Sequence, residues 1–230
     1  MGLLLLVRHG QASFGADDYD VLSPDGVTQS WRLAAALLDQ GVKPSALRHG
    51  ALRRQRETAY QLTLAAGWTV AEDVDPRWDE FDHLAVMGAY PVLPPEQRER
   101  LESGALDRRE FQEIFEKATT RWAAGTHDAD YAETFAAFTK RVRDALSEAA
   151  RLAGPGETAV VVSSGGPIAA ACAMLTGVAD NPRRLSAAWR RLNAVMVNSS
   201  VTRVVIGSSG ARLLTFNEHT HLGGQLVTYR

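Results

Sequence analysis

Arg8 and His9 are adjacent side chains whose types suggest chemistry on a phosphate group. The guanidinium of Arg8 is a permanent cation, and its fork of N–H donors fits phosphate oxygens. The imidazole of His9 is a nucleophile near neutral pH when it is uncharged. The pair could therefore hold a phosphate group beside an attacking nitrogen. The alternative is that both side chains make structural hydrogen bonds at the end of a strand.

A buried strand is expected to position this pair. Residues 3–7, Leu-Leu-Leu-Leu-Val, form a short unbroken apolar run. Such a run is typical of a strand covered on both faces, although the pattern alone does not exclude a helix. In open α/β sheets, ligands bind at the carboxyl ends of the strands. Arg8 and His9 would then lie at that edge, and Gly10 would let the backbone approach a ligand closely.

A second basic cluster lies at the start of a predicted helix. Residues 51–59, Ala-Leu-Arg-Arg-Gln-Arg-Glu-Thr-Ala, begin this helix, which is expected to end at Gly67. Successive residues of a helix diverge by about 100°, so Arg53, Arg54 and Arg56 cannot all face one ligand. We expect either one arginine directed at the ligand or a basic face exposed to solvent.

An acidic and aromatic segment follows at residues 76–83, Pro-Arg-Trp-Asp-Glu-Phe-Asp-His. Apolar neighbours would raise the pKa of a carboxyl group in this segment, as a general acid needs. The alternative is an ordinary acidic loop with two packed aromatic rings.

A glycine-rich turn follows a second apolar run. Residues 158–162 predict a buried strand, and residues 163–167, Ser-Ser-Gly-Gly-Pro, lead from it into a helix. Backbone N–H groups and the helix dipole at such a turn favour an anion. The turn is not a Walker A loop, because no Gly-Lys-Ser/Thr follows, and it lacks the spacing of a Gly-x-Ser-x-Gly elbow.

The order of the elements predicts the fold class. We expect an α/β protein built as a three-layer α/β/α sandwich, with a mainly parallel sheet and an antiparallel edge. Helix caps and hydrophobic periodicity mark the elements outside the motifs above. These are a helix from Ser23 to Gly41, a strand within 45–50, a helix from Phe135 to Gly154, and a hairpin that joins 195–206 to 213–216.

Residues 84–130 differ from the rest of the chain because they combine prolines, charged runs and a helical stretch. We interpret them as a helical insertion in a single domain that spans residues 1–230. Insertions of this kind often cap a site and set the choice of substrate. Their aromatic side chains could equally form the face of a homodimer.

The composition favours a cytoplasmic protein. The 230 residues include 25 basic and 27 acidic side chains, which argues against a binder of nucleic acid or of a membrane surface. The apolar runs are too short for a membrane span or a signal segment. The one cysteine, Cys172, lies in an apolar helical run and is expected in the core. His219 and His221 are a weak metal signal, and we expect neither metal nor cofactor.

The four motifs, taken in order, resemble those of the histidine phosphatase superfamily, in its phosphoglycerate mutase-like branch. They are Leu-Val-Arg-His-Gly-Gln, then Leu-Arg-Arg-Gln-Arg-Glu-Thr-Ala, the Trp-Asp-Glu-Phe loop and Val-Val-Ser-x-Gly-Gly-x-Ile. The resemblance covers most of the chain outside the insertion. It implies a metal-independent phosphatase that acts on a small phosphorylated metabolite or another phosphoester.

The resemblance also implies roles for individual residues. His9 corresponds to the nucleophile that becomes phosphorylated, and Glu80 to the acid that protonates the leaving oxygen and later activates water. Arg8 and Arg54 correspond to the arginines that bind phosphate. Arg54 is chosen because the family's arginine lies two residues after the Leu and four before the Thr. The other expected substrate contacts are Gln11, Ser13, Ser164 and Gly165.

Ser164 stands where the family usually has a second histidine, in Ser-His-Gly-Gly. A serine hydroxyl is a neutral donor, roughly half as strong as a charged one. If the lost donor acted mainly in the transition state, the rate would fall by on the order of 10²–10³. The chain could be a slow phosphatase, a mutase, or a non-catalytic binder of a phosphorylated ligand or a protein. It could also compensate with one of its other histidines, His83, His219 or His221.

Overall fold

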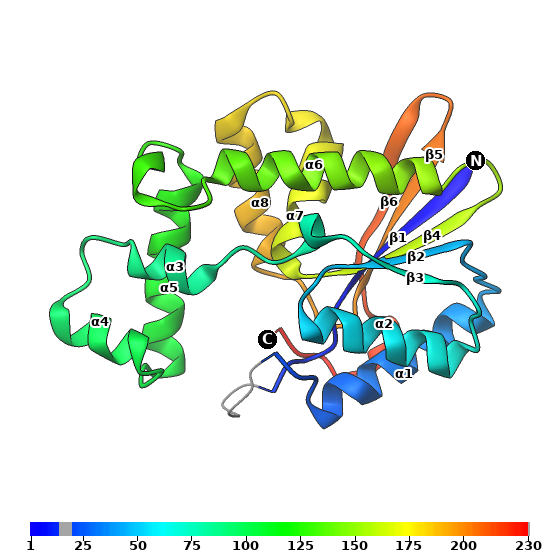
Figure 1. Ribbon diagram of the computed structural model, residues 1–230, viewed down its shortest axis with the longest axis horizontal. Helices are drawn as coiled ribbons and strands as arrows, with labels where there is room; N and C mark the ends of the chain where they lie inside the picture. Colours follow the sequence, from blue (N-terminus) through cyan, green and yellow to red (C-terminus); the bar gives the residue numbers. More distant parts are fainter. Residues whose placement is uncertain (14–19, 230) are drawn as a thin grey trace. The chain divides into compact units, whose positions relative to one another are not determined.

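One mixed sheet organises the fold in the computed structural model, which describes residues 1–13 and 20–229 (Figure 1). The strand order is β3-β2-β4-β1-β5-β6. β3, β2, β4 and β1 are parallel, β5 is antiparallel to β1, and β6 is antiparallel to β5. This confirms the mainly parallel sheet with an antiparallel edge. The strands are β1 (Gly2–Arg8), β2 (Ala46–His49), β3 (Glu72–Val74), β4 (Thr158–Ser163), β5 (Val201–Gly207) and β6 (Gly210–Glu218).

The apolar run at residues 3–7 lies in β1, as predicted, between β4 and β5. Most of its side chains are fully buried because both faces of the sheet are covered. Arg8 at the end of β1 pairs in register with Ser163 at the end of β4. The two strands therefore end at the same edge of the sheet, where His9 and Ser164 directly follow them.

Helices cover both faces of this sheet (Figure 1). α1 (Pro24–Asp39) and α2 (Arg53–Ala66) lie on one face and enclose a hydrophobic core with β1, β2 and β4. On the other face lie α7 (Gly165–Ala173) and the 141–152 part of α6 (Phe135–Leu152). α8 (Pro182–Asn193) packs against α7. The layers confirm the predicted α/β/α sandwich.

Capping residues fix the start of α1 and the end of α2. The Oγ of Ser23 accepts a hydrogen bond from the N–H of Gly26 (3.0 Å), and Pro24 is the first residue of α1. α2 ends at Gly67, whose φ of +63° suits a residue without a side chain. Both ends lie where the sequence predicts them.

The chain divides into two compact units. One contains Met1–Glu80 with Arg141–Arg230, and the other is Phe81–Lys140. The smaller unit extends beyond the predicted insertion at 84–130 because its aromatic core includes both flanks. The ring centroids of Phe81 and Trp122 are 4.7 Å apart, and those of Trp122 and Phe138 are 5.4 Å apart. A role of this unit as a cap over the site stays a prediction. Its helices are α3 (His83–Gly88), α4 (Pro95–Glu102), α5 (Arg108–Ala123) and the first residues of α6.

β5 and β6 form the predicted hairpin, with Gly210 in its turn at a φ of +95°. β5 begins at Val201 rather than at residue 195. Ser199 interrupts the extended backbone with a φ of +55°, and its N–H donates to the carbonyl of His9 (3.1 Å). Short helical turns complete the described elements: η1 (Pro76–Trp78), η2 (Asp128–Asp130), the π-helical η3 (Met174–Val178) and η4 (Thr220–Leu222).

Cys172 lies in the core of the larger unit, as predicted. Burial raises the pKa of its thiol to about 12, so the group stays uncharged and is a poor nucleophile. No helix in the described ranges combines the length and the apolar character needed to cross a bilayer. The predicted cytoplasmic location stays a prediction.

Candidate active site

His9 directly follows β1 and is only 5% exposed. Its Nδ1 lies 2.7 Å from the carbonyl oxygen of Gly10, and the Nε of Arg54 donates to its Nε2 at 3.1 Å. An arginine N–H can only donate, so Nε2 must carry a lone pair. The hydrogen-bond pattern therefore assigns the proton to Nδ1, which donates to Gly10. The ring is held as the neutral tautomer whose Nε2 can act as a nucleophile.

The surroundings of His9 favour this neutral form. Burial lowers the pKa of His9 well below its ordinary value of 6.5, and the charges of Arg54 and Arg8 lower it further. The hydrogen bond to the Gly10 carbonyl opposes the shift. Burial is the largest of these causes. His9 is thus uncharged at physiological pH.

Gly10 lies where the start of α1 packs against the backbone that follows β1. A Cβ at this position would lie 2.4 Å from the carbonyl oxygen of Gly26, and a Cβ on Gly26 would lie 2.2 Å from the carbonyl oxygen of Gln11. The two glycines let the start of α1 pack directly on the backbone that follows β1. Gly10 is therefore required for contact with α1, and the expected close approach of its backbone to a ligand stays a prediction.

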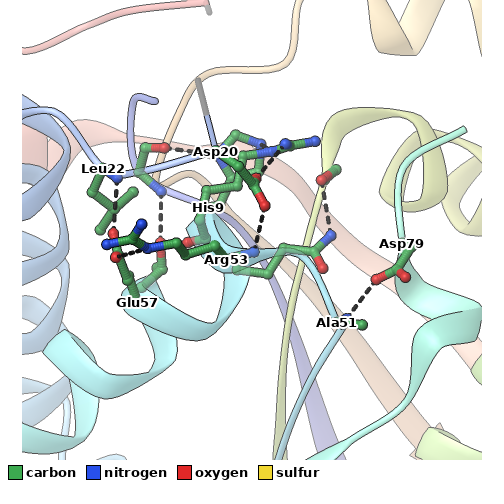
Figure 2. A network of polar contacts seen from close by, with 12 residues as sticks. His9, Asp20, Leu22, Ala51, Arg53, Glu57 and Asp79 are labelled. Carbon is green, nitrogen blue, oxygen red and sulfur yellow. Dashed lines mark hydrogen bonds and ion pairs between the residues drawn. The ribbon is translucent and has the colours of Figure 1, made fainter. Parts of the chain in front are cut away.

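Arg54 is the arginine of the predicted trio that reaches His9. Its side chain is buried in the first turn of α2, and its Nη1 contacts the Oδ1 of Asp20 at 2.6 Å. Arg53 and Arg56 are exposed, and Arg53 pairs with Glu57 instead (2.7 Å, Figure 2). This agrees with the helical geometry, which prevents the three side chains from sharing one direction.

Arg8, the last residue of β1, binds main-chain carbonyl groups. Its Nη1 donates to the oxygen of Met196, and its Nη2 donates to that of Tyr229 at 3.0 Å. A Cβ on Gly165 would lie 3.6 Å from the Nε of Arg8. This is an ordinary contact distance, so the start of α7 lies beside the guanidinium, and the structure brings these two predicted residues together.

Glu80 and Ser164 meet the start of α7 as well. The N–H of Gly166 donates to the Oε2 of Glu80 at 3.0 Å. Ser164 is fully buried at the N-cap position, and its Oγ accepts a hydrogen bond from the Nε2 of Gln55 at 2.9 Å. Gln55 also donates to the carbonyl oxygen of Trp78 at 3.1 Å. The start of α7 thus holds the expected acid and the serine that replaces histidine.

Sequence reasoning missed Gln55, which connects α2 to Ser164. The residue follows Arg54 directly, on the turn of α2 that meets the strand ends. Its amide is fully buried, and its Oε1 has no hydrogen-bond partner among the described residues. No local sequence signal marks Gln55, because its hydrogen bonds join segments that are distant in the chain.

The carboxyl group with a raised pKa in the acidic segment is Asp79. Burial raises its pKa, whereas hydrogen bonds from the N–H groups of Ala51 and Leu52, and the nearby charges of Arg141 and Arg54, oppose the shift. Its Oδ1 accepts the N–H of Ala51 at 2.5 Å (Figure 2). Asp79 therefore ties the segment before α2 to the acidic segment, a structural contact that the sequence did not predict.

Gln11 and Ser13 are the remaining residues expected to contact the substrate. Gln11 donates its N–H to the Oε1 of Gln29 (2.8 Å), and its own Oε1 accepts from Ser23. The N–H of Ser13 donates to the carbonyl of Val21 (2.8 Å). In residues 1–13 and 20–229, neither side chain is hydrogen-bonded to Arg8, His9 or Arg54. Residues 14–19, which follow Ser13, lie outside the described residues.

The three histidines considered as substitutes for the missing one have main-chain or aromatic contacts. The Nδ1 of His219 lies 2.6 Å from the carbonyl of Asn217, and the Nε2 of His221 lies 3.0 Å from that of Ser199. His83 belongs to the smaller unit, where its ring meets the edge of Phe111. Recruitment of any of them in place of the missing histidine stays a prediction.

The fold and the buried pair of histidine and arginine define an α/β protein with a cationic site around a neutral imidazole. The sequence profile of the histidine phosphatase superfamily (branch 1) matches residues 4–219. Because this match spans nearly the whole chain, the protein belongs to the histidine phosphatase superfamily, as its motifs indicated. A search of curated protein sequences finds no match.

Solved structures share the fold at low identity. A phosphoserine phosphatase mutant from Entamoeba histolytica, in complex with phosphoserine, is 17% identical with a TM-score of 0.64, and the match covers 96% of this chain and all of that one. A mycobacterial glucosyl-3-phosphoglycerate phosphatase is 24% identical with a TM-score of 0.57, and the match covers 94% of this chain and 99% of that one. A phosphoglycerate mutase from Bacillus anthracis is 19% identical with a TM-score of 0.61, and the match covers 96% of this chain and 95% of that one. These similarities establish the fold alone.

Proposed function

We propose that the protein is a phosphomonoester hydrolase that works through a phosphohistidine on His9. The observation that carries this proposal is the geometry of the ring, whose Nδ1 is held by the Gly10 carbonyl and whose Nε2 faces the Nε of Arg54. A structural histidine does not need a neutral Nε2 beside two arginines, whereas a nucleophile that attacks a phosphate ester does. Membership in the superfamily supports the same chemistry.

In the first step, the Nε2 lone pair of His9 attacks phosphorus. The bond between phosphorus and the ester oxygen breaks, and Glu80 gives its carboxyl proton to the leaving oxygen. Charge on the transferring phosphoryl oxygens is balanced by Arg8 and Arg54. The hydrogen bond from Gly166 to Glu80 supports this role, because it fixes the carboxyl group at the start of α7.

In the second step, water attacks the phosphohistidine. The Glu80 carboxylate accepts a proton from that water, the bond between phosphorus and Nε2 breaks, and the electron pair returns to the ring. Orthophosphate then leaves. We infer that neither step needs a metal ion, so the hydrolysis rate should be the same with and without EDTA.

Ser164 is proposed to donate its hydroxyl proton to a phosphoryl oxygen in place of the family's usual histidine. Because its Oγ already accepts the Nε2 of Gln55, the hydroxyl hydrogen must point elsewhere. Ser164 is the N-cap residue of α7, and the N–H groups at the start of a helix favour an anion. Gln55 would therefore orient the donor, although a neutral donor is weaker than a charged one.

Two alternatives are kept, a mutase and a non-catalytic binder, and the replacement of a histidine by Ser164 favours the second. A mutase would return the phosphoryl group to a phosphorylated acceptor, which would show as transfer in place of orthophosphate release. A non-catalytic binder would show no hydrolysis in the wild type but hydrolysis in Ser164→His. The positioned Glu80 and the neutral His9 favour the hydrolase, since a binder needs neither group.

The proposal is tested by measuring orthophosphate release from a panel of small phosphate monoesters. In His9→Ala, the rate should fall by on the order of 10³-fold or more. His127→Ala is the matched control, because this histidine is exposed and has no proposed role in the site, and its rate should stay within about twofold of wild type. Hydrolysis that persists in His9→Ala would overturn the proposal.

A further inference from the structure

Asp20 places a carboxylate on the arginine that contacts the candidate nucleophile. Its Oδ1 lies 2.6 Å from the Nη1 of Arg54, and its Oδ2 accepts the backbone N–H of Arg53 at 2.6 Å (Figure 2). Arg53 is the first residue of α2. The carboxylate therefore bridges a buried guanidinium and the N-terminus of a 14-residue helix. The same guanidinium group contacts the His9 ring.

These two donors are also those that a phosphate group would use. A guanidinium pairs with a phosphate through parallel N–H bonds, and the N–H groups at the start of a helix point at an anion. A phosphoryl group on the Nε2 of His9 would adjoin Arg54, since the Nε of that arginine contacts Nε2 directly. Two anions cannot share the same donors without strong repulsion.

We propose that Asp20 is an internal anion that competes with the phosphate group of the substrate for Arg54 and the first N–H of α2. This inference rests on the proposed function, because it assumes that Arg54 binds phosphate. Asp20 must leave its place for a phosphate group to make both contacts. Small anions such as orthophosphate then bind weakly, and a substrate needs contacts beyond its phosphate group to displace the carboxylate.

A purely structural role for Asp20 predicts the opposite result. If the carboxylate served only to aim Arg54 at His9, its removal would leave the guanidinium poorly placed, and phosphate would bind more weakly. If the carboxylate competes, its removal makes phosphate bind more tightly. The sign of the change in affinity therefore separates the two roles.

The experiment is isothermal titration calorimetry of inorganic phosphate into the full chain at fixed pH and ionic strength. Asp20→Asn keeps the size of the side chain but removes its charge, and we expect the dissociation constant to fall about tenfold, the change from losing one charge-assisted contact. Glu57→Gln is the matched control. This substitution removes the charge of a carboxylate whose oxygens bind Arg53 and the N–H of Leu22. The affinity of this variant for phosphate should stay within twofold of wild type.

The outcomes also separate this inference from the proposed function. Unchanged or weaker phosphate binding in Asp20→Asn, or equal tightening in Glu57→Gln, would overturn the competition. If Arg54→Ala binds phosphate as the wild type does, the proposed phosphate site itself fails. With a hydrolysed ester, Asp20→Asn should lower KM about tenfold without raising kcat, whereas a structural role would lower kcat. Asp20→Ala provides a second variant in which the same fall in KM is expected.

Discussion

At the scale of single residues, the protonation of His9 decides whether the proposed chemistry can start. Burial and two neighbouring arginines all disfavour the charged ring. These influences stabilise the form with a lone pair on Nε2, and the Gly10 carbonyl fixes which nitrogen keeps the proton. The proposed nucleophile therefore needs no separate base to activate it.

The first prediction concerns the pH at which His9 becomes charged. Its pKa is lowered well below 6.5, so at pH 6 a larger fraction of His9 is neutral than of an exposed histidine. An NMR titration of the ring carbons in the unliganded protein should show His9 still neutral at pH 6. Arg54→Gln removes one of the charges and should raise the pKa. A midpoint at or above 6.5 in the wild type would contradict this account.

The second prediction concerns the replacement for the missing histidine. Ser164→Ala should lower kcat about tenfold, the effect of one neutral hydrogen bond. Gln55→Met should give a similar loss, because the hydroxyl loses the partner that orients it. The double variant should lose little more than either single variant, since both changes remove one interaction. Losses that multiply would show that the two side chains act independently.

At the scale of elements, close backbone packing places the site. α1 approaches the segment after β1 through Gly10 and Gly26, without side chains between them. Thr58 of α2 accepts the N–H of Gly10 at 3.0 Å and donates to the carbonyl of Arg54. Both helices on this face are therefore fixed to the backbone that carries His9.

The third prediction tests that packing. Gly26→Ala would place a methyl group 2.2 Å from the carbonyl oxygen of Gln11, so α1 must shift. We expect the free energy of unfolding to fall by about 1–3 kcal/mol, as for overpacked cores, together with weaker phosphate binding. Gly88→Ala is the control, because its Cβ would meet nothing within 4 Å. Urea unfolding would measure both variants, and equal stability would contradict the argument.

The elements that the sequence predicts are those with local signals. Apolar runs mark β1 and β4, and Ser23, Pro24 and Gly67 mark helix ends by their own chemistry. β3, with the sequence Glu-Asp-Val, has no such signal, because its side chains are exposed and form no apolar pattern. It forms a strand by pairing with β2. Asp20, Gln55 and Asp79 gain their roles from contacts between distant segments, and no local pattern reveals such contacts.

At the scale of the whole molecule, charged groups tie separate elements of the larger unit together. Glu148 of α6 binds Arg48 of β2 (2.7 Å) and Arg77 of η1 (2.5 Å), and Arg77 also binds Asp75 (2.7 Å). The hydrogen bonds from Arg77 and Arg48 lower the pKa of Glu148 to about 2. This network lies within the larger unit and links one helix to the side of the sheet that carries β2 and β3.

The fourth prediction follows from that pKa. The carboxyl group of Glu148 titrates near 4.5 in the unfolded chain and near 2 in the folded protein. Its contribution to stability is therefore complete above pH 4.5 and is lost as the pH falls toward 2. Glu148→Gln should have a lower Tm than wild type at pH 7, and the difference should shrink between pH 4.5 and 2. Glu157→Gln, an exposed control, should change little, and a pH-independent difference in Glu148→Gln would contradict the account.

The central claim is that His9 carries the phosphoryl group during turnover. The most direct measurement is rapid quenching with alkali after mixing the enzyme with an ester labelled with ³²P, followed by identification of the labelled peptide by mass spectrometry. The account predicts an acid-labile, alkali-stable phosphoryl group on His9, formed in the wild type and absent in His9→Ala. Hydrolysis by the wild type without any label on His9 would contradict it.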